Sequence, residues 1–132
     1  HLKKKVFIVG ETITPAMRKC DILVAVSGSG KTTSVVDVAR ATKGLGGKIA
    51  GITSNRESEL ASLSDRVVII PSEFIPREVA SYDLRNIMGI PLPPMGSLFE
   101  ISVLIFFEAC VLELMKQLGI QEETMKKIHA NL

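Results

Sequence analysis

The sequence predicts an α/β domain with a doubly wound parallel sheet, and three observations support this fold class. Short apolar runs rich in β-branched residues alternate with helical patterns along the chain. These runs are continuous rather than alternating, which is typical of strands covered on both faces of a parallel sheet. Aromatic residues make up only 5% of the chain, and Trp is absent. An all-β sandwich usually carries more aromatic residues, so an aliphatic α/β core is favoured.

The elements follow one another in the order β, β, α, β, α, β, which implies right-handed crossovers between parallel strands. Strands are predicted at Val6–Val9, Ile22–Val26, Lys48–Thr53 and Val67–Ile70. Helices are predicted at Thr32–Gly44, Glu57–Leu63, Arg77–Met88, 98–118 and Glu122–His129. The glycines after position 43 give the first of these helices a C-terminal stop signal.

The helix over 98–118 is apolar nearly all round. Ser97 precedes it with Glu100 three residues later, which is the pattern of a capping box. A helix without a polar face needs cover on every side, so we expect a homo-oligomer, a dimer or tetramer, that forms through this helix. Glu100, Glu108 and Glu113 interrupt the apolar run, and this argues against a membrane span.

Composition limits the partners and the compartment. The chain of 132 residues has the size of one domain, which we assign to residues 1–132. A net charge of +2 gives no electrostatic footprint for nucleic acid. Cys20 and Cys110 lie far apart without a metal-ligand pattern, so we expect no metal site and a reduced, cytoplasmic setting. The start His1-Leu2-Lys3 lacks the apolar region of a signal peptide.

The segment Ser27-Gly28-Ser29-Gly30-Lys31-Thr32 carries the clearest chemical signal. A buried strand runs into this loop of small residues, and a helix starts directly after it. Free backbone N–H groups and hydroxyls at the positive end of a helix suit a phosphate dianion. A tight turn with one serine cap explains a single serine, but two serines, two glycines and a threonine favour phosphate binding.

A nucleotide-binding P-loop is the alternative for this segment, because Gly30-Lys31-Thr32 fits the end of a Walker A motif. The opening glycine of that motif is replaced by Ala25, and Pro71 follows the next apolar strand where a Walker B aspartate is expected. A nucleotide hydrolase is therefore the weaker hypothesis.

Thr53 and Ser54 follow the end of another predicted strand, where ligands of open α/β sheets collect. They are candidates to bind the sugar or its phosphate. A helix N-cap explains Ser54 equally well.

Four stretches of the chain resemble the sugar isomerase (SIS) domain family, and within it the 6-phospho-3-hexuloisomerases. They are Val9–Pro15, Ser27–Thr32 with its strand, Pro94–Glu100 and His129–Leu132. The resemblance implies a flavodoxin-like, three-layer αβα sandwich and a cytoplasmic homotetramer. It also implies an isomerase, without a cofactor, that interconverts hex-3-ulose 6-phosphate and fructose 6-phosphate through an enediol, in the ribulose monophosphate pathway.

The resemblance also assigns roles to single residues. It implies that Glu100 is the base that moves the proton, whereas the residues alone leave a helix cap equally open. It makes His129 a candidate proton shuttle. Lys31 departs from the acidic residue that many members carry there, and the family's N-terminal helix and first strand are expected to be absent. A non-catalytic SIS module that senses a phosphosugar would keep Ser27–Thr32 without needing Glu100 or His129.

Overall fold

The computed structural model describes residues 5–71 and 97–126. The chain forms two compact units. The first, Met17–Val103, contains the sheet and the loop that follows its first strand. The second combines His1–Ala16 with Leu104–Leu132. The candidate site lies in the first unit, so its geometry is independent of the placement of the second.

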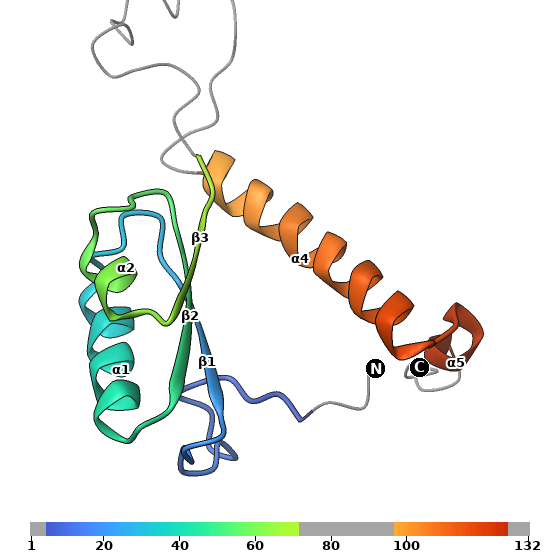
Figure 1. Ribbon diagram of the computed structural model, residues 1–132, viewed down its shortest axis with the longest axis horizontal. Helices are drawn as coiled ribbons and strands as arrows, with labels where there is room; N and C mark the ends of the chain where they lie inside the picture. The colour runs from blue at the N-terminus through green and yellow to red at the C-terminus, as the bar shows by residue number, and fades with distance from the viewer. Residues whose placement is uncertain (1–4, 72–96, 127–132) are drawn as a thin grey trace, which may run out of the picture. The chain divides into compact units, whose positions relative to one another are not determined.

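The sheet has three parallel strands in the order β1-β2-β3. The elements of this unit are β1 (Ile22–Val26), α1 (Thr33–Gly44), β2 (Lys48–Thr53), α2 (Glu59–Leu63) and β3 (Arg66–Ile69). Val24 lies opposite Ala50, and Gly51 lies opposite Val67. The two crossover helices cover the same face of the sheet (Figure 1). Because the strands are parallel, their carboxyl ends meet at one edge, where open α/β sheets bind ligands.

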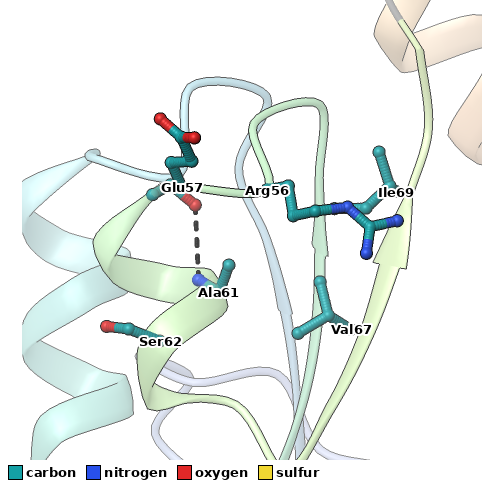
Figure 2. A pocket seen from close by; sticks show the side chains of 7 residues that line it. Arg56, Glu57, Ala61, Ser62, Val67 and Ile69 are labelled. Atoms are coloured by element: carbon teal, nitrogen blue, oxygen red, sulfur yellow. Dashed lines mark hydrogen bonds between the residues drawn. The ribbon is translucent and has the colours of Figure 1, made fainter.

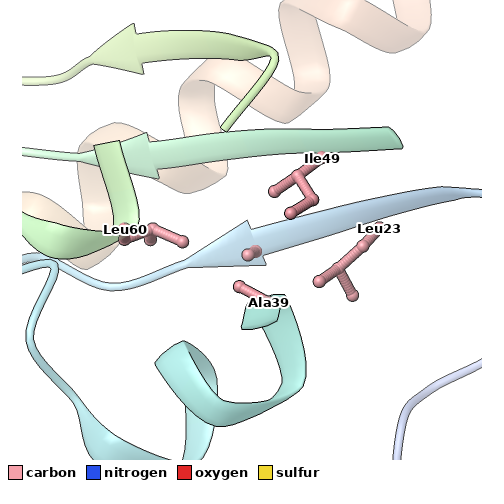
Figure 3. Close-up of a cluster of buried hydrophobic side chains, with 5 residues drawn as sticks. Leu23, Ala39, Ile49 and Leu60 are labelled. Atoms are coloured by element: carbon pink, nitrogen blue, oxygen red, sulfur yellow. The ribbon is translucent and has the colours of Figure 1, made fainter. Parts of the chain in front are cut away.

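The core of this unit lies between the sheet and its two helices. Leu23 of β1 points to the same face as Ile49 of β2, where Ala39 of α1 and Leu60 of α2 also lie (Figure 3). Ala25 of β1 belongs to the same cluster. All five residues are buried, and Ala39 and Leu60 have no exposed surface. Burial of each large aliphatic side chain contributes about 1.5–3 kcal/mol, so this cluster fixes both helices on the sheet.

Helix α1 ends at glycines, as the sequence predicted. The amide of Leu45 donates to Ala41 O at 3.1 Å, and the amide of Gly46 donates to Lys43 O at 3.1 Å. Gly46 has a φ of +76°, a left-handed conformation that glycine adopts without a steric penalty. The turn therefore sends the chain directly into β2.

Asp65 ties the beginnings of β2 and β3 together. Its carboxylate accepts from the Ile49 amide at 2.9 Å and forms an ion pair with Lys48 Nζ at 3.1 Å. Both partners lower the pKa of Asp65 below its ordinary value of 3.8, and the hydrogen bond from the Ile49 N–H has a larger effect than the Lys48 ammonium. This carboxylate therefore supports the fold in its charged form.

Two helices follow in the C-terminal part, α4 (Ser97–Leu118) and α5 (Glu122–Lys126). Phe99 and Val103 are the buried residues of α4. Several of its large apolar side chains are exposed by a third or more, namely Ile101, Leu104, Ile105, Phe107, Leu112, Leu114 and Leu118. No helix within residues 5–71 and 97–126 combines the length and apolarity that crossing a membrane requires.

Most of the predicted elements are confirmed, including the α/β class and the parallel sheet. The third strand is displaced by one residue from the predicted Val67–Ile70. The strand predicted at Val6–Val9 is wrong: these residues form no strand, and Val6 is 82% exposed. A strand needs a neighbour for its backbone hydrogen bonds, and none of the described strands pairs with this segment. The helix predicted at Arg77–Met88 lies outside the described residues.

Candidate functional site

The predicted phosphate loop, Ser27–Thr32, lies where β1 ends and α1 begins. The Ser27 amide donates to Ile52 O at 3.0 Å, which extends the pairing of β1 with β2 by one residue. Gly30 then takes a φ of +64°, which reverses the chain before the helix starts at Thr33. The loop thus sits at the carboxyl edge of the sheet, as the sequence predicted.

Hydroxyl groups hold the loop in a closed shape. Ser27 Oγ accepts from the Gly30 amide at 3.0 Å and lies 2.9 Å from Thr32 Oγ1. The Lys31 amide donates to Ser29 Oγ at 3.2 Å. Ser27 is only 6% exposed, whereas Ser29, Lys31 and Thr32 face solvent. Ser27 therefore shapes the loop from inside, and the exposed residues are the ones that a ligand reaches first.

The start of α1 leaves backbone donors available beside this loop. Thr32 is the N-cap residue, and its side chain makes no capping hydrogen bond. The first N–H groups of a helix, here those of Thr33, Ser34 and Val35, have no partner within the helix. They carry the positive end of the helix dipole. No acidic side chain lies in the first turn of α1. This combination suits an anion such as a phosphate group.

The segment after β2 binds the carbonyl oxygen of Gly28. Thr53 Oγ1 donates to this oxygen at 3.0 Å, Ser54 Oγ at 2.7 Å and the Ser54 amide at 3.0 Å. Thr53 also accepts from the Asn55 amide at 3.2 Å and has no exposed surface. Both hydroxyls predicted to bind the ligand are thus engaged with the loop backbone.

Gly30 lies directly against the start of α2. A Cβ atom at this position would come within 2.1 Å of Ser58 Oγ and 2.9 Å of Thr53 Oγ1. Ser58 is the N-cap residue of α2, where its side chain accepts from the Ala61 amide at 3.3 Å. The Leu60 amide donates to Gly30 O at 3.1 Å. Sequence reasoning missed Ser58, although a serine just before a helix is a typical N-cap signal.

The first turn of α4 packs against the same loop. A Cβ atom on Gly28 would lie 3.3 Å from Phe99 Cδ1, and Phe99 is 6% exposed. Glu100 follows Phe99 in this turn, and its side chain is exposed. Sequence reasoning also missed the role of Phe99, because no pattern shows which apolar residue of α4 meets the loop. His129 lies outside the described residues.

A separate shallow pocket of about 270 Å³ lies between the start of α2 and β3. Arg56 and Glu57 line its rim, with Ser62 of α2 and with Val67 and Ile69 of β3 (Figure 2). It contains no residue of Ser27–Thr32. Across the described part of the chain, no three His, Cys, Asp or Glu side chains gather in a way that would hold a metal ion.

Fold and site together define a parallel α/β domain in which the loop between the first strand and the first helix suits an anion. The family model of the SIS domain matches residues 2–90, and the chain belongs to this family.

Relatives from several organisms cover the whole chain. An uncharacterized protein of Aeropyrum pernix is 41% identical over 100% of this chain and 63% of its own length. A Bacillus subtilis protein named 3-hexulose-6-phosphate isomerase is 36% identical over 100% of this chain and 68% of its own. The chain therefore spans roughly two thirds of the length of these relatives.

Solved structures agree with this family. A protein of Methanococcus jannaschii, for which its crystal structure inferred the function of 3-hexulose-6-phosphate isomerase, is 32% identical. It superimposes with a TM-score of 0.78 over 99% of this chain and 65% of its own. The fold prediction is thereby confirmed.

Proposed function

We propose that this chain is the phosphate-binding part of an isomerase that interconverts hex-3-ulose 6-phosphate and fructose 6-phosphate. The observation that carries the proposal is the loop Ser27–Thr32, whose exposed residues lie beside the free amides of α1. Relatives that cover the whole chain and bear the name 3-hexulose-6-phosphate isomerase support the choice of substrate.

The reaction moves a carbonyl group between C3 and C2 of the sugar phosphate. A base removes the proton from C2 of the hex-3-ulose while O3 gains a proton, which gives a 2,3-enediol. The C2–O2 carbonyl forms as O2 loses its proton, and C3 receives a proton. One carboxylate can carry out both transfers at carbon, because it is first the base and then the acid.

We assign the transfers at carbon to Glu100. The contact between Phe99 and Gly28 supports this assignment, because it holds the turn that carries Glu100 beside the phosphate loop. The transfers at O2 and O3 need a second group, and His129 is our candidate for it. Lys31, which is exposed in the loop, adds a positive charge that favours the phosphate.

We also propose that the chain self-associates through α4 and works in the cytoplasm. Exposed apolar side chains on several sides of this helix, such as Leu104, Ile105 and Leu112, support self-association. The two unpaired cysteines, Cys20 and Cys110, agree with a reducing compartment.

Glu100→Gln tests the function, because an amide keeps the size of the side chain but accepts no proton. We expect turnover to fall by about 10²–10⁴-fold while the dissociation constant for fructose 6-phosphate stays nearly unchanged. Glu108→Gln, at another exposed position of α4, is the matched control and should keep full turnover.

Three outcomes would contradict the proposal. A Glu100→Gln variant with the parent's turnover would remove Glu100 from the chemistry. A protein of its relatives' full length that contains this chain and binds fructose 6-phosphate without converting it would indicate a non-catalytic sensing module. Binding of ATP with Mg²⁺ in place of the sugar phosphate would favour the nucleotide-binding alternative.

A further inference from the structure

Two carbonyl oxygens of the phosphate loop accept hydrogen bonds from the segment that connects β2 to α2. Gly28 O accepts the three hydrogen bonds from Thr53 and Ser54, and Gly30 O accepts from the Leu60 amide at 3.1 Å. Three donors on one oxygen leave the peptide group after Gly28 little freedom to rotate. These donors all come from one short stretch, Thr53–Leu60, which we name the carbonyl clamp.

The direction of these carbonyls also decides the direction of two amides. A trans peptide group is planar, and its C=O and N–H point in opposite directions. The Gly28–Ser29 and Gly30–Lys31 bonds are trans. With both oxygens turned toward the carbonyl clamp, the N–H groups of Ser29 and Lys31 point away from it. Lys31 N–H donates to Ser29 Oγ, whereas none of the described residues accepts from Ser29 N–H.

An anion gains from this arrangement in two ways. A carbonyl oxygen carries a partial negative charge, so a phosphate group is bound better where such oxygens face away. The N–H groups of Ser29 and Lys31 share this side of the loop, whereas the Gly30 N–H between them donates to Ser27, and N–H dipoles turned outward together attract an anion. The Ser29 amide is then a free donor on the same loop that leads into the free amides of α1.

We propose that Thr53 and Ser54 are positioning residues, which fix the Gly28–Ser29 peptide so that the Ser29 amide faces the phosphate. This inference rests on the proposed phosphate site. Thr53 supports it most directly, because it is fully buried and therefore acts on a ligand through Gly28 rather than by contact. Thr53 thus tunes affinity for the phosphate without touching it.

The test compares Thr53→Val with Thr53→Ser in the 132-residue chain. Valine keeps the volume of threonine and loses the hydroxyl, whereas serine keeps the hydroxyl and loses a methyl group. We expect Thr53→Val to weaken binding of fructose 6-phosphate and of inorganic phosphate about five- to tenfold, as for the loss of one hydrogen bond. Thr53→Ser should stay within about twofold of the parent, although it also loses stability through the cavity.

Nuclear magnetic resonance reports on the peptide itself. The carbonyl ¹³C signal of Gly28 and the amide ¹⁵N signal of Ser29 should move in Thr53→Val and stay near the parent position in Thr53→Ser. Ser64→Ala is the control for a lost hydroxyl, because Ser64 Oγ donates to Leu60 O at 2.7 Å away from the loop. It should bind phosphate like the parent.

The affinities of the parent and the two Thr53 variants test the positioning role of Thr53. Parental affinity in Thr53→Val would overturn the positioning role, as would equal losses in both Thr53 variants, which would indicate a purely structural effect. A parent that binds neither phosphate nor fructose 6-phosphate would overturn the proposed function as well. If Thr53→Val does not fold, Ser54→Ala removes the 2.7 Å bond to the same oxygen and should weaken binding in the same direction.

Discussion

The contact between Gly30 and Ser58 leads to a prediction about stability that needs no ligand. Gly30→Ala places a Cβ atom 2.1 Å from Ser58 Oγ and 2.3 Å from Ser58 Cβ, on a backbone with a φ of +64°. The left-handed conformation costs an alanine about 1–2 kcal/mol. Overlap with a buried side chain adds about 1–3 kcal/mol. We therefore expect the free energy of unfolding to fall by about 2–5 kcal/mol.

Gly46→Ala is the matched control for the backbone cost. Gly46 has a φ of +76°, but a Cβ atom there would meet only the flexible Lys19 side chain, at 3.6 Å or more. This variant should lose only about 1–2 kcal/mol. Denaturant unfolding followed by circular dichroism measures both values. Equal losses in the two variants would refute the close approach of α2 to the loop.

A double variant isolates the overlap. Ser58→Gly removes the atoms that the new Cβ atom would meet, and glycine at an N-cap costs only a few tenths of a kcal/mol. Combined with Gly30→Ala, it should recover about 1–2 kcal/mol of the loss, which a double-mutant cycle reports as coupling between the two positions.

Two further predictions concern acid sensitivity and assembly. Because the pKa of Asp65 is lowered in the folded state, its contribution to stability is present above the ordinary value of 3.8 and is lost as the pH falls through the lower folded value. In urea titrations, Asp65→Asn should therefore lose less stability than the parent as the pH falls from about 5 to about 2. Equal losses in the two proteins would contradict the stabilising role of the Asp65 carboxylate. Ile105→Lys, at a position 63% exposed, should weaken self-association by at least about tenfold in sedimentation across a dilution series. A parent chain that is monomeric throughout the series would end the assembly proposal.

The sequence predicts much of this fold because, in most elements, the local pattern and the long-range packing favour the same structure. The run Ile22–Val26 and the helix that begins after Thr32 are confirmed almost to the residue. Val6–Val9 has the same composition as a strand, but a strand also requires a pairing partner, and composition carries no information about partners. The prediction therefore failed where the outcome depended on the rest of the sheet.

The loop was predictable from its sequence, whereas the functions of its neighbours were not. Hydroxyl residues after a strand suit a ligand contact and a backbone contact equally well. Only burial separates the two, and Thr53 is fully buried with its hydroxyl on Gly28 O. Ser58 and Phe99 were missed because their importance comes from the absence of side chains at Gly30 and Gly28.

The absence of side chains at two glycines explains how two helices approach the loop closely. Gly30 admits Ser58 and the start of α2, and Gly28 admits Phe99 and the start of α4. Neither helix could approach the loop as closely if a side chain stood at these positions. The carbonyl clamp, Thr53–Leu60, thus holds the loop from one side by binding its carbonyl oxygens. The loop also contacts the first turn of α4, which carries Glu100. For an isomerase this matters, because the distance between the phosphate and the reacting carbons is fixed by the substrate. Under our proposal that Glu100 is the base and that the loop binds the phosphate, Glu100 must be positioned relative to the loop, and the Gly28–Phe99 contact holds the turn that carries it.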